Sequence, residues 1–231
     1  MKKIELKGTI VSNDDKWIYD YFGIEAVCPK DIQNALKEAN GEDVTIEVNS
    51  GGGDLFSGNE MYYLLSQYPG ETTADIVGLA ASAATIVCCG AKRVRAVPGA
   101  MYMIHNVAGE ANGDYRVMDK HSEVLKTANK AIVKAFMQKT NLSEKELLAL
   151  MDKESWFSAL QAKEKGFIDE IIGEKQPLEN LYNHAFVQIL SNEVKEKIRN
   201  LVKTPAADKQ DFILLENRLK LLKLKGEIKD V

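Results

Sequence analysis

The chain has few of the features that disulfide-rich, secreted or membrane-spanning proteins need. Only three of its 231 residues are cysteines, and two of them, Cys88 and Cys89, are adjacent, so we expect buried free thiols rather than a disulfide framework. No run of apolar residues approaches the roughly 18 that a membrane span requires. The first residues, MKKIELKGTIVSNDD, lack the apolar core of a signal peptide, and we therefore expect a cytoplasmic protein with no membrane partner.

A net positive charge and cofactor motifs are also missing. A net charge of -4 gives no overall field that would attract nucleic acid, and we expect no nucleic-acid partner. The sequence contains no CxxC, HExxH or GxxxxGK(S/T) motif, so it predicts neither zinc chemistry nor intrinsic ATP hydrolysis, and we expect no metal and no cofactor. The hydrophobic fraction of 45% is ordinary for a globular protein.

Hydrophobic periodicity predicts an α/β protein in which strands and helices alternate. Strands are predicted at 4–11, 44–49, 73–77, 93–97 and 100–105. Helices are predicted at 28–41, between the glycine loop and Pro69, at 80–89 and at 114–139. Gly78 is predicted to turn the chain, which puts Ser82 in the first turn of the helix at 80–89.

The last part of the predicted domain contains two helix caps. Ser143 and Glu146 form a capping box pattern, and 155–172 is predicted to form a short turn, a helix capped by Ser158 and a final strand. These patterns divide the chain into a domain at 1–175 and a helical extension at 176–231, which carries two basic, leucine-bearing helical patterns.

Serine and histidine are the candidates for nucleophilic chemistry. A serine hydroxyl needs a base to take its proton, and imidazole is the usual base at neutral pH. Of the three histidines, His121 lies inside the long predicted helix and His184 in the extension, whereas His105 ends a strand, where α/β folds place catalytic groups. Ser82, in GLAASAAT, lies at a helix start that favours developing negative charge, although small residues there also suit a closely packed helix.

The glycine run at 51–53 follows a predicted strand. Glycine allows positive φ angles, so a backbone N–H there can turn towards a substrate carbonyl oxygen. With the N–H of Ala83, the residue after Ser82, it would form an oxyanion hole. Because glycine runs are also common in ordinary loops, this motif gains weight only together with Ser82 and His105.

Four ordered motifs together resemble one family. VNSGGGD resembles the INSPGG loop of Clp proteolytic subunits, GLAASAAT their serine segment, MIHN their MIH segment, and ESWFSALQAKEKGFIDEI the region around their third triad residue. The resemblance covers 1–175 and implies a ClpP/crotonase-like α/β fold of repeated β-β-α units with a long handle helix, assembled as a homo-oligomeric ring. It also implies that Ser82 is the nucleophile, that His105 is the base, and that the N–H groups of Gly53 and Ala83 form the oxyanion hole.

The third triad position departs from the family pattern. The family usually has an aspartate four residues before the serine of its SA pair, and here Glu154 stands four residues before Ser158. A glutamate can also orient an imidazole. Asp152 is the rival for this role.

Further departures resemble a subgroup. The WFSA variant, the GGG run and the long C-terminal extension are similar to the Clp-like head maturation proteases of tailed bacteriophages and prophages, whose substrates are scaffold and capsid proteins. This resemblance implies a serine endopeptidase that acts in the host cytoplasm, including the assembling prohead. The first strand begins where the family carries its axial gate segment, which counts against an ATPase partner.

Three other functions remain open. One is a housekeeping Clp peptidase that is fed by an ATP-dependent unfoldase. Another is a crotonase-like acyl-CoA enzyme, which shares the fold and uses backbone N–H groups for a thioester oxyanion but normally needs no Ser–His pair. The third is a catalytically inactive structural or scaffold-binding ring, to which Glu154 and the extension point.

Overall fold

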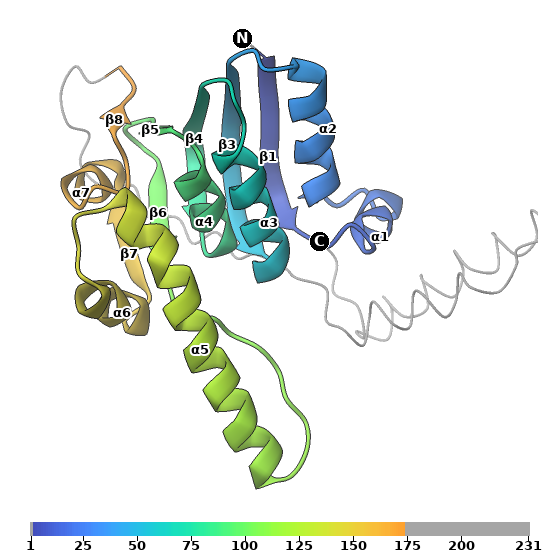
Figure 1. Cartoon of the computed structure of the whole chain (residues 1–231), viewed down its shortest axis with the longest axis vertical. Coiled ribbons are helices and arrows are strands. Elements are labelled where there is room, and N and C mark those ends of the chain that lie inside the picture. The colour runs from blue at the N-terminus through green and yellow to red at the C-terminus, as the bar shows by residue number, and fades with distance from the viewer. Residues whose placement is uncertain (1, 174–231) are drawn as a thin grey trace, which may run out of the picture.

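The structure is a computed structural model that describes residues 2–173, shown in Figure 1. The predicted extension at 176–231, with His184, lies outside the described residues. The strands are β1 (Lys2–Ile10), β2 (Ala26–Val27), β3 (Val44–Gly53), β4 (Thr72–Ala81), β5 (Arg93–Ala96), β6 (Met101–Ile104), β7 (Ser155–Ser158) and β8 (Glu170–Ile171). The helices are α1 (Lys16–Tyr21), α2 (Pro29–Ala39), α3 (Leu55–Ser66), α4 (Ala83–Gly90), α5 (Tyr115–Lys139), α6 (Glu144–Asp152) and α7 (Ala159–Glu164).

The strands form one mostly parallel sheet. Its main path runs β2-β1-β3-β4-β5-β8, while β6 pairs with β4, and β7 pairs with β6. All of these pairs are parallel except β6 with β7. Parallel neighbours need crossover connections, which the helices α2, α3 and α4 supply. The expected α/β fold class, consistent with the Clp fold, is confirmed.

The two faces of the sheet differ in polarity because successive residues of a strand point to opposite sides. In β1, Ile4 and Leu6 are buried in the main core with Ile46 and Val48 of β3. The helices α2, α3 and α4 lie against these strands in Figure 1. On the opposite face the charged residues that alternate with them meet, and the Nζ of Lys7 lies 2.8 Å from a carboxylate oxygen of Glu47.

Strand β4 changes partner half-way along its length. Its residues 73–76 pair with β5, whereas 79–81 pair with β6. At the change, the Asn49 Oδ1 accepts a hydrogen bond from the Leu79 N–H at 3.1 Å, and a Cβ atom at Gly78 would lie 2.5 Å from that oxygen. The predicted turn at Gly78 is therefore wrong: Gly78 accommodates the Asn49 side chain inside a strand that continues to Ala81.

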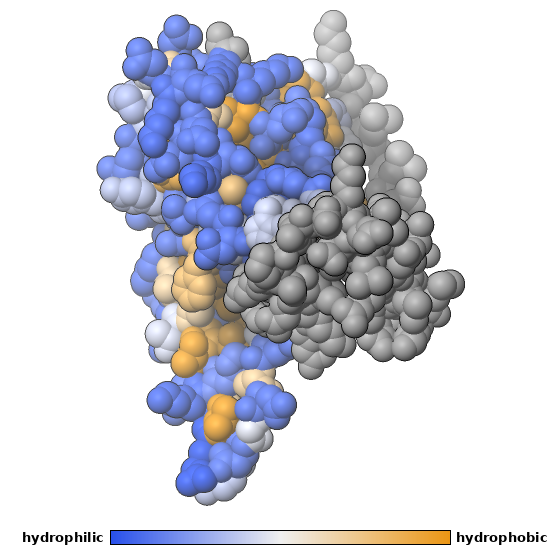
Figure 2. Space-filling view, turned by 90° about the vertical axis from the view of Figure 1, so that its right-hand side faces the viewer, coloured by the Kyte–Doolittle hydropathy of each residue, from blue (hydrophilic) through white to orange (hydrophobic). Residues whose placement is uncertain are grey.

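The long helix α5 is half packed and half projecting. Ile132, Val133 and Phe136 near its C-terminal end are buried, and Phe136 meets the ring of Phe167 edge-on at 5.9 Å between centroids. The N-terminal half projects away from the sheet in Figure 1, and Figure 2 shows hydrophobic surface along this projection. The large apolar side chains exposed on α5 are those of Tyr115, Val117, Met118, Val124 and Met137.

Several local expectations need correction. The stretch 155–158, expected as a short turn, is the strand β7, whose four residues are too few to show a period. The six-residue helix α1 and the two-residue strand β2 were not predicted, for the same reason. The caps hold, since Ser143 and Ser158 both form capping boxes. In the part of the chain that the structure describes, no helix combines the length and apolarity needed to cross a membrane.

Candidate active site

Ser82 stands in a strained turn between β4 and α4. The sequence predicted that Ser82 lies in the first turn of this helix, but it is the N-cap residue of α4. Its φ angle of 55° with ψ of -126° is rare for a residue with a side chain. Its N–H donates to the Met103 carbonyl of β6 at 3.0 Å, and its own carbonyl accepts from the Thr85 N–H and hydroxyl. Hydrogen bonds to β6 and to α4 therefore fix the backbone of Ser82. Its hydroxyl takes no part in these bonds and lies at the edge of the sheet.

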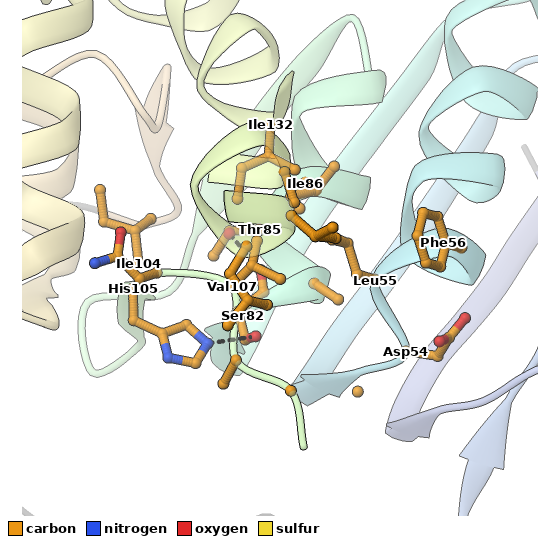
Figure 3. A pocket seen from close by; sticks show the side chains of 18 of the residues that line it. Asp54, Leu55, Phe56, Ser82, Thr85, Ile86, Ile104, His105, Val107 and Ile132 are labelled. Carbon is orange, nitrogen blue, oxygen red and sulfur yellow. Dashed lines mark hydrogen bonds between the residues drawn. The ribbon is translucent and has the colours of Figure 1, made fainter. Parts of the chain in front are cut away.

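His105 meets Ser82 from the next strand of the sheet. It follows the last residue of β6, which pairs in parallel with the end of β4. Its Nε2 lies 2.7 Å from the Ser82 Oγ, a hydrogen-bond distance, as Figure 3 shows. The two side chains that the sequence singled out thus lie in direct contact.

The glycine run packs directly beneath Ser82. Gly52 has φ of 91°, and a Cβ atom there would lie 2.6 Å from the Ala81 carbonyl oxygen and 2.8 Å from both the Ala83 nitrogen and the Ser82 Cβ. Gly53 has φ of 148°, and a Cβ atom there would lie 2.1 Å from the Ile10 carbonyl oxygen of β1. Only glycine fits at these two positions without moving the backbone.

The electrostatic surroundings of His105 favour its neutral form. Burial lowers the pKa of the imidazole below its ordinary value of 6.5, because desolvation disfavours the charged ring, while the nearby negative charge of Glu154 acts in the opposite direction. Burial is the stronger influence. A half-buried neutral imidazole in contact with a hydroxyl is suited to accept its proton at neutral pH.

The two candidate carboxylates have different surroundings. The ladder of β6 with β7 ends at the pair Ile104 and Ser155, the residues next to His105 and Glu154 in the chain. Glu154 has φ of 48°, and its Oε1 accepts from the Trp156 indole N–H at 3.4 Å. Asp152 instead accepts a hydrogen bond from the Asn106 amide at 2.7 Å. Within residues 2–173, neither carboxylate hydrogen-bonds the imidazole. Glu154 acts on His105 only through its charge, and Asp152 is bonded to Asn106, the residue that follows His105.

A cavity of about 390 Å³ opens beside the Ser–His pair. Figure 3 shows the aliphatic side chains of Leu55, Ile86 and Ile132 gathered near Ser82 and His105. The cavity continues along α5 as far as His121, and the loop after β6 forms another side of it. A cleft of this size with apolar walls and few polar groups can hold a peptide side chain next to the hydroxyl. Across the described residues, no three His, Cys, Asp or Glu side chains gather in a way that could hold a metal ion.

Three residues of this site were not identified from the sequence. The sequence analysis treated Gly52 only as part of a glycine run. In the structure, a side chain at Gly52 would collide with Ser82 and the residues on either side of it, and only Gly53 has a closer neighbour in this loop. Asn106 and His121 line the cavity. The position of Asn106 next to His105 in MIHN was a sequence signal that it lies near the site. No sequence signal placed His121 there, because only folding brings the loop after β6 onto α5.

Comparisons with known proteins show similarity to Clp proteases. Residues 30–175 match the family model described as Clp protease. The ATP-dependent Clp protease proteolytic subunit 1 of Chlamydia abortus is 28% identical over 163 residues, which cover 65% of this chain and 84% of that subunit. The ATP-dependent Clp protease proteolytic subunit of Bacteroides fragilis is 29% identical over 137 residues, 58% of this chain and 66% of that subunit. The corresponding subunit 1 of Streptomyces avermitilis is 30% identical over 132 residues, 56% of this chain and 61% of that protein.

Proposed function

Because the chain belongs to the Clp protease family, we propose that it is a serine endopeptidase in which Ser82 is the nucleophile and His105 the general base. The observation that carries this proposal is the 2.7 Å contact between the Ser82 Oγ and the His105 Nε2. In the first step, His105 takes the hydroxyl proton as the oxygen attacks the peptide carbonyl. The imidazolium then gives that proton to the leaving amine, and a water molecule hydrolyses the acyl-enzyme by the same route.

The developing oxyanion needs hydrogen-bond donors. Ala83 is the first residue of α4, and the first N–H groups of a helix have no acceptor within it. The helix dipole adds a favourable potential at the same place. We assign the oxyanion hole to the N–H groups of Ala83 and Gly53, because the packing of Gly52 against Ser82 and Ala83 brings the glycine loop to this side of the hydroxyl.

Glu154 is proposed as the third member of the site, with Asp152 as the rival. It is the carboxylate whose charge acts on the His105 pKa, and it directly precedes Ser155, which pairs with Ile104, the neighbour of His105. Its role would be to stabilise the imidazolium that forms in the transition state. Asp152 could act only through Asn106, to which it is hydrogen-bonded.

A change of Glu154 to glutamine is expected to shift the pH profile of peptide cleavage. The catalytic form of His105 is neutral, so kcat/KM rises with pH through the pKa of the free enzyme, which burial places below 6.5. Because the charge of Glu154 raises this pKa, Glu154→Gln should move the acid limb to lower pH and lower the plateau by at least about tenfold. The matched variant Asp152→Asn should leave the midpoint in place. A midpoint that moves with Asp152→Asn and stays with Glu154→Gln would transfer the role to Asp152.

Chemical labelling separates the proposed nucleophile from the thiols. Burial raises the pKa of Cys89 to about 12 and raises that of Cys88 further, so neither is a thiolate at neutral pH. A fluorophosphonate should therefore modify Ser82 alone in the native protein, and prior treatment with iodoacetamide should leave the yield unchanged. His105→Ala should prevent the labelling. An unlabelled wild-type Ser82, located by mass spectrometry, would contradict the proposal.

The finer function that we propose is cleavage of scaffold and capsid proteins during phage head maturation, by a catalytic unit at 1–175 followed by the extension at 176–231. It is supported by the GGG run, the WFSA segment and the extension, in which the chain departs from the usual Clp pattern. The exposed apolar side chains of α5 support assembly with further copies into a ring, because such a surface on a projecting helix needs a partner.

The second candidate function is housekeeping proteolysis with an ATP-dependent unfoldase. It is favoured by the relatives described above, which are named ATP-dependent Clp proteolytic subunits. Co-expression of the chain with scaffold and capsid proteins would test the first function by their cleavage. A stable complex with a Clp ATPase, together with uncleaved scaffold and capsid, would favour the second.

A further inference from the structure

The strained turn at Ser82 is supported by a side chain of α4. The carbonyl oxygen of Ser82 accepts two hydrogen bonds from Thr85, one from its N–H at 3.0 Å and one from its hydroxyl at 2.5 Å. Any residue but proline can make the first bond, whereas the second needs a side-chain hydroxyl at this position. Thr85 is fully buried, and Figure 3 shows it next to Ser82. A threonine of the first helical turn therefore holds the carbonyl group of the proposed nucleophile.

This carbonyl belongs to the same peptide group as the Ala83 N–H. The atoms of a peptide group lie in one plane, and in the trans form the C=O and N–H bonds point in opposite directions. The Ser82–Ala83 peptide is trans. The plane therefore turns as a unit, and a hydroxyl that fixes the direction of the Ser82 oxygen also fixes the direction of the Ala83 N–H.

The nitrogen end of this peptide group lies beside the glycine loop. A Cβ atom at Gly52 would lie 2.8 Å from the Ala83 nitrogen. The plane itself is set by the unusual Ser82 conformation, with φ of 55° and ψ of -126°. Such a conformation persists only where the surrounding contacts hold it. Without the Thr85 hydroxyl, the plane is expected to relax towards an ordinary ψ angle and to turn the Ala83 N–H with it.

We propose that Thr85 is a positioning residue whose hydroxyl, acting through the Ser82–Ala83 peptide group, aims the Ala83 N–H at the oxyanion. This inference rests on the proposed function, in which that N–H is a donor of the oxyanion hole. Because the oxyanion forms only after the hydroxyl of Ser82 attacks, the Thr85 hydroxyl should act on kcat and leave KM unchanged.

The test compares variants of Thr85 on one fluorogenic peptide. Thr85→Val keeps the shape of the side chain without its hydroxyl, and it should lower kcat by at least about tenfold with KM within about twofold of the wild-type value. Complete loss of an oxyanion donor costs about 10²- to 10³-fold, so a donor that is only turned aside costs less. Thr85→Ser keeps the hydroxyl and should stay within about threefold of the wild-type kcat. Thr85→Ala also lacks the hydroxyl and is too small to collide with its neighbours, so it should repeat the loss even if the valine variant fails to fold.

Thr140→Val is the matched control, because Thr140 makes the same pair of bonds elsewhere. Its N–H and its hydroxyl both donate to the Phe136 carbonyl, at 2.8 and 2.9 Å. Its side chain is buried after the last residue of α5, outside the cavity lining. Thr140→Val should lose a similar amount of thermal stability and keep kcat within about twofold of the wild-type value. An equal fall of kcat in Thr140→Val and Thr85→Val would show only the general cost of a lost threonine bond and would overturn the inference.

Crystal structures of the wild-type protein and of these two valine variants give a readout that needs no turnover. The Ser82 ψ angle should move away from -126° in Thr85→Val and stay in place in Thr140→Val. If the wild-type protein cleaves no peptide, the proposed function fails, while this comparison still decides whether Thr85 holds the peptide group. An unchanged ψ angle in Thr85→Val, or a kcat within about twofold of the wild-type value, would overturn the inference.

Discussion

Replacement of Ser82 by alanine is expected to lower kcat/KM for peptide cleavage by about 10⁴- to 10⁶-fold, because the only proposed nucleophile is lost. The hydroxyl makes one side-chain hydrogen bond in the described chain, to the His105 Nε2, and the other bonds of Ser82 use its backbone. The variant should therefore keep its fold and its assembly. Measurement of single-turnover and steady-state rates on one fluorogenic peptide gives the size of the loss.

Two controls make this result specific. Ser66→Ala removes a hydroxyl that bonds to the Tyr63 carbonyl at the exposed end of α3, outside the lining of the cavity, and it should keep the wild-type rate. Thermal unfolding and the mass in solution of Ser82→Ala should match those of the wild-type protein. A Ser82→Ala variant that retains more than about a tenth of the wild-type rate, with the same fold, would show that another residue attacks the peptide.

The pair Ser82 and His105 could be predicted from the sequence because one lies at a predicted helix start and the other at a predicted strand end. Hydrophobic periodicity placed His105 at the end of a predicted strand and Ser82 at the start of the helix that follows another, and parallel strands of one sheet end at the same edge. The resemblance to Clp subunits then supplied the pairing that periodicity alone left open. The 2.7 Å contact depends on β4 bending around Asn49 so that its second half pairs with β6, a contact between segments about 30 residues apart that no local pattern reveals.

The third position could not be resolved from the sequence because it depends on a short antiparallel pair. The pattern of the resembled family favoured Glu154 but left Asp152 open. The ladder between β6 and β7 is four residues long and joins segments about 50 residues apart, and it brings the residues next to Glu154 and His105 together. His121 was set aside for a related reason. A histidine inside a helix cannot be placed beside a cavity until the loop that covers it is placed, and that loop contacts α5 through Gly109 and Asn129.

The second large effect is expected at Gly52, which touches the nucleophile only through its backbone. Gly52→Ala would place a methyl group 2.6 Å from the Ala81 carbonyl oxygen and 2.8 Å from the Ser82 Cβ, so the turn that carries Ser82 must move. Displacement of a reacting group by about 1 Å can cost about 10²-fold in rate. The same movement disturbs the Ala83 N–H, whose nitrogen would lie 2.8 Å from the methyl group, and with it the proposed oxyanion hole. We therefore expect kcat/KM to fall by at least about 10²-fold.

Gly23→Ala is the matched control for this change. Gly23 also has a positive φ, of 65°, but a Cβ atom there would meet no heavy atom within 4 Å, so the substitution introduces backbone strain without a collision. It should cost about 1 kcal/mol of stability and leave kcat/KM within about twofold of the wild-type value. Both variants are compared by thermal unfolding and by peptide cleavage. If Gly52→Ala lost no more activity than Gly23→Ala while remaining folded, the position of Ser82 would not depend on the glycine loop, and the assignment of Gly53 to the oxyanion hole would lose its structural support.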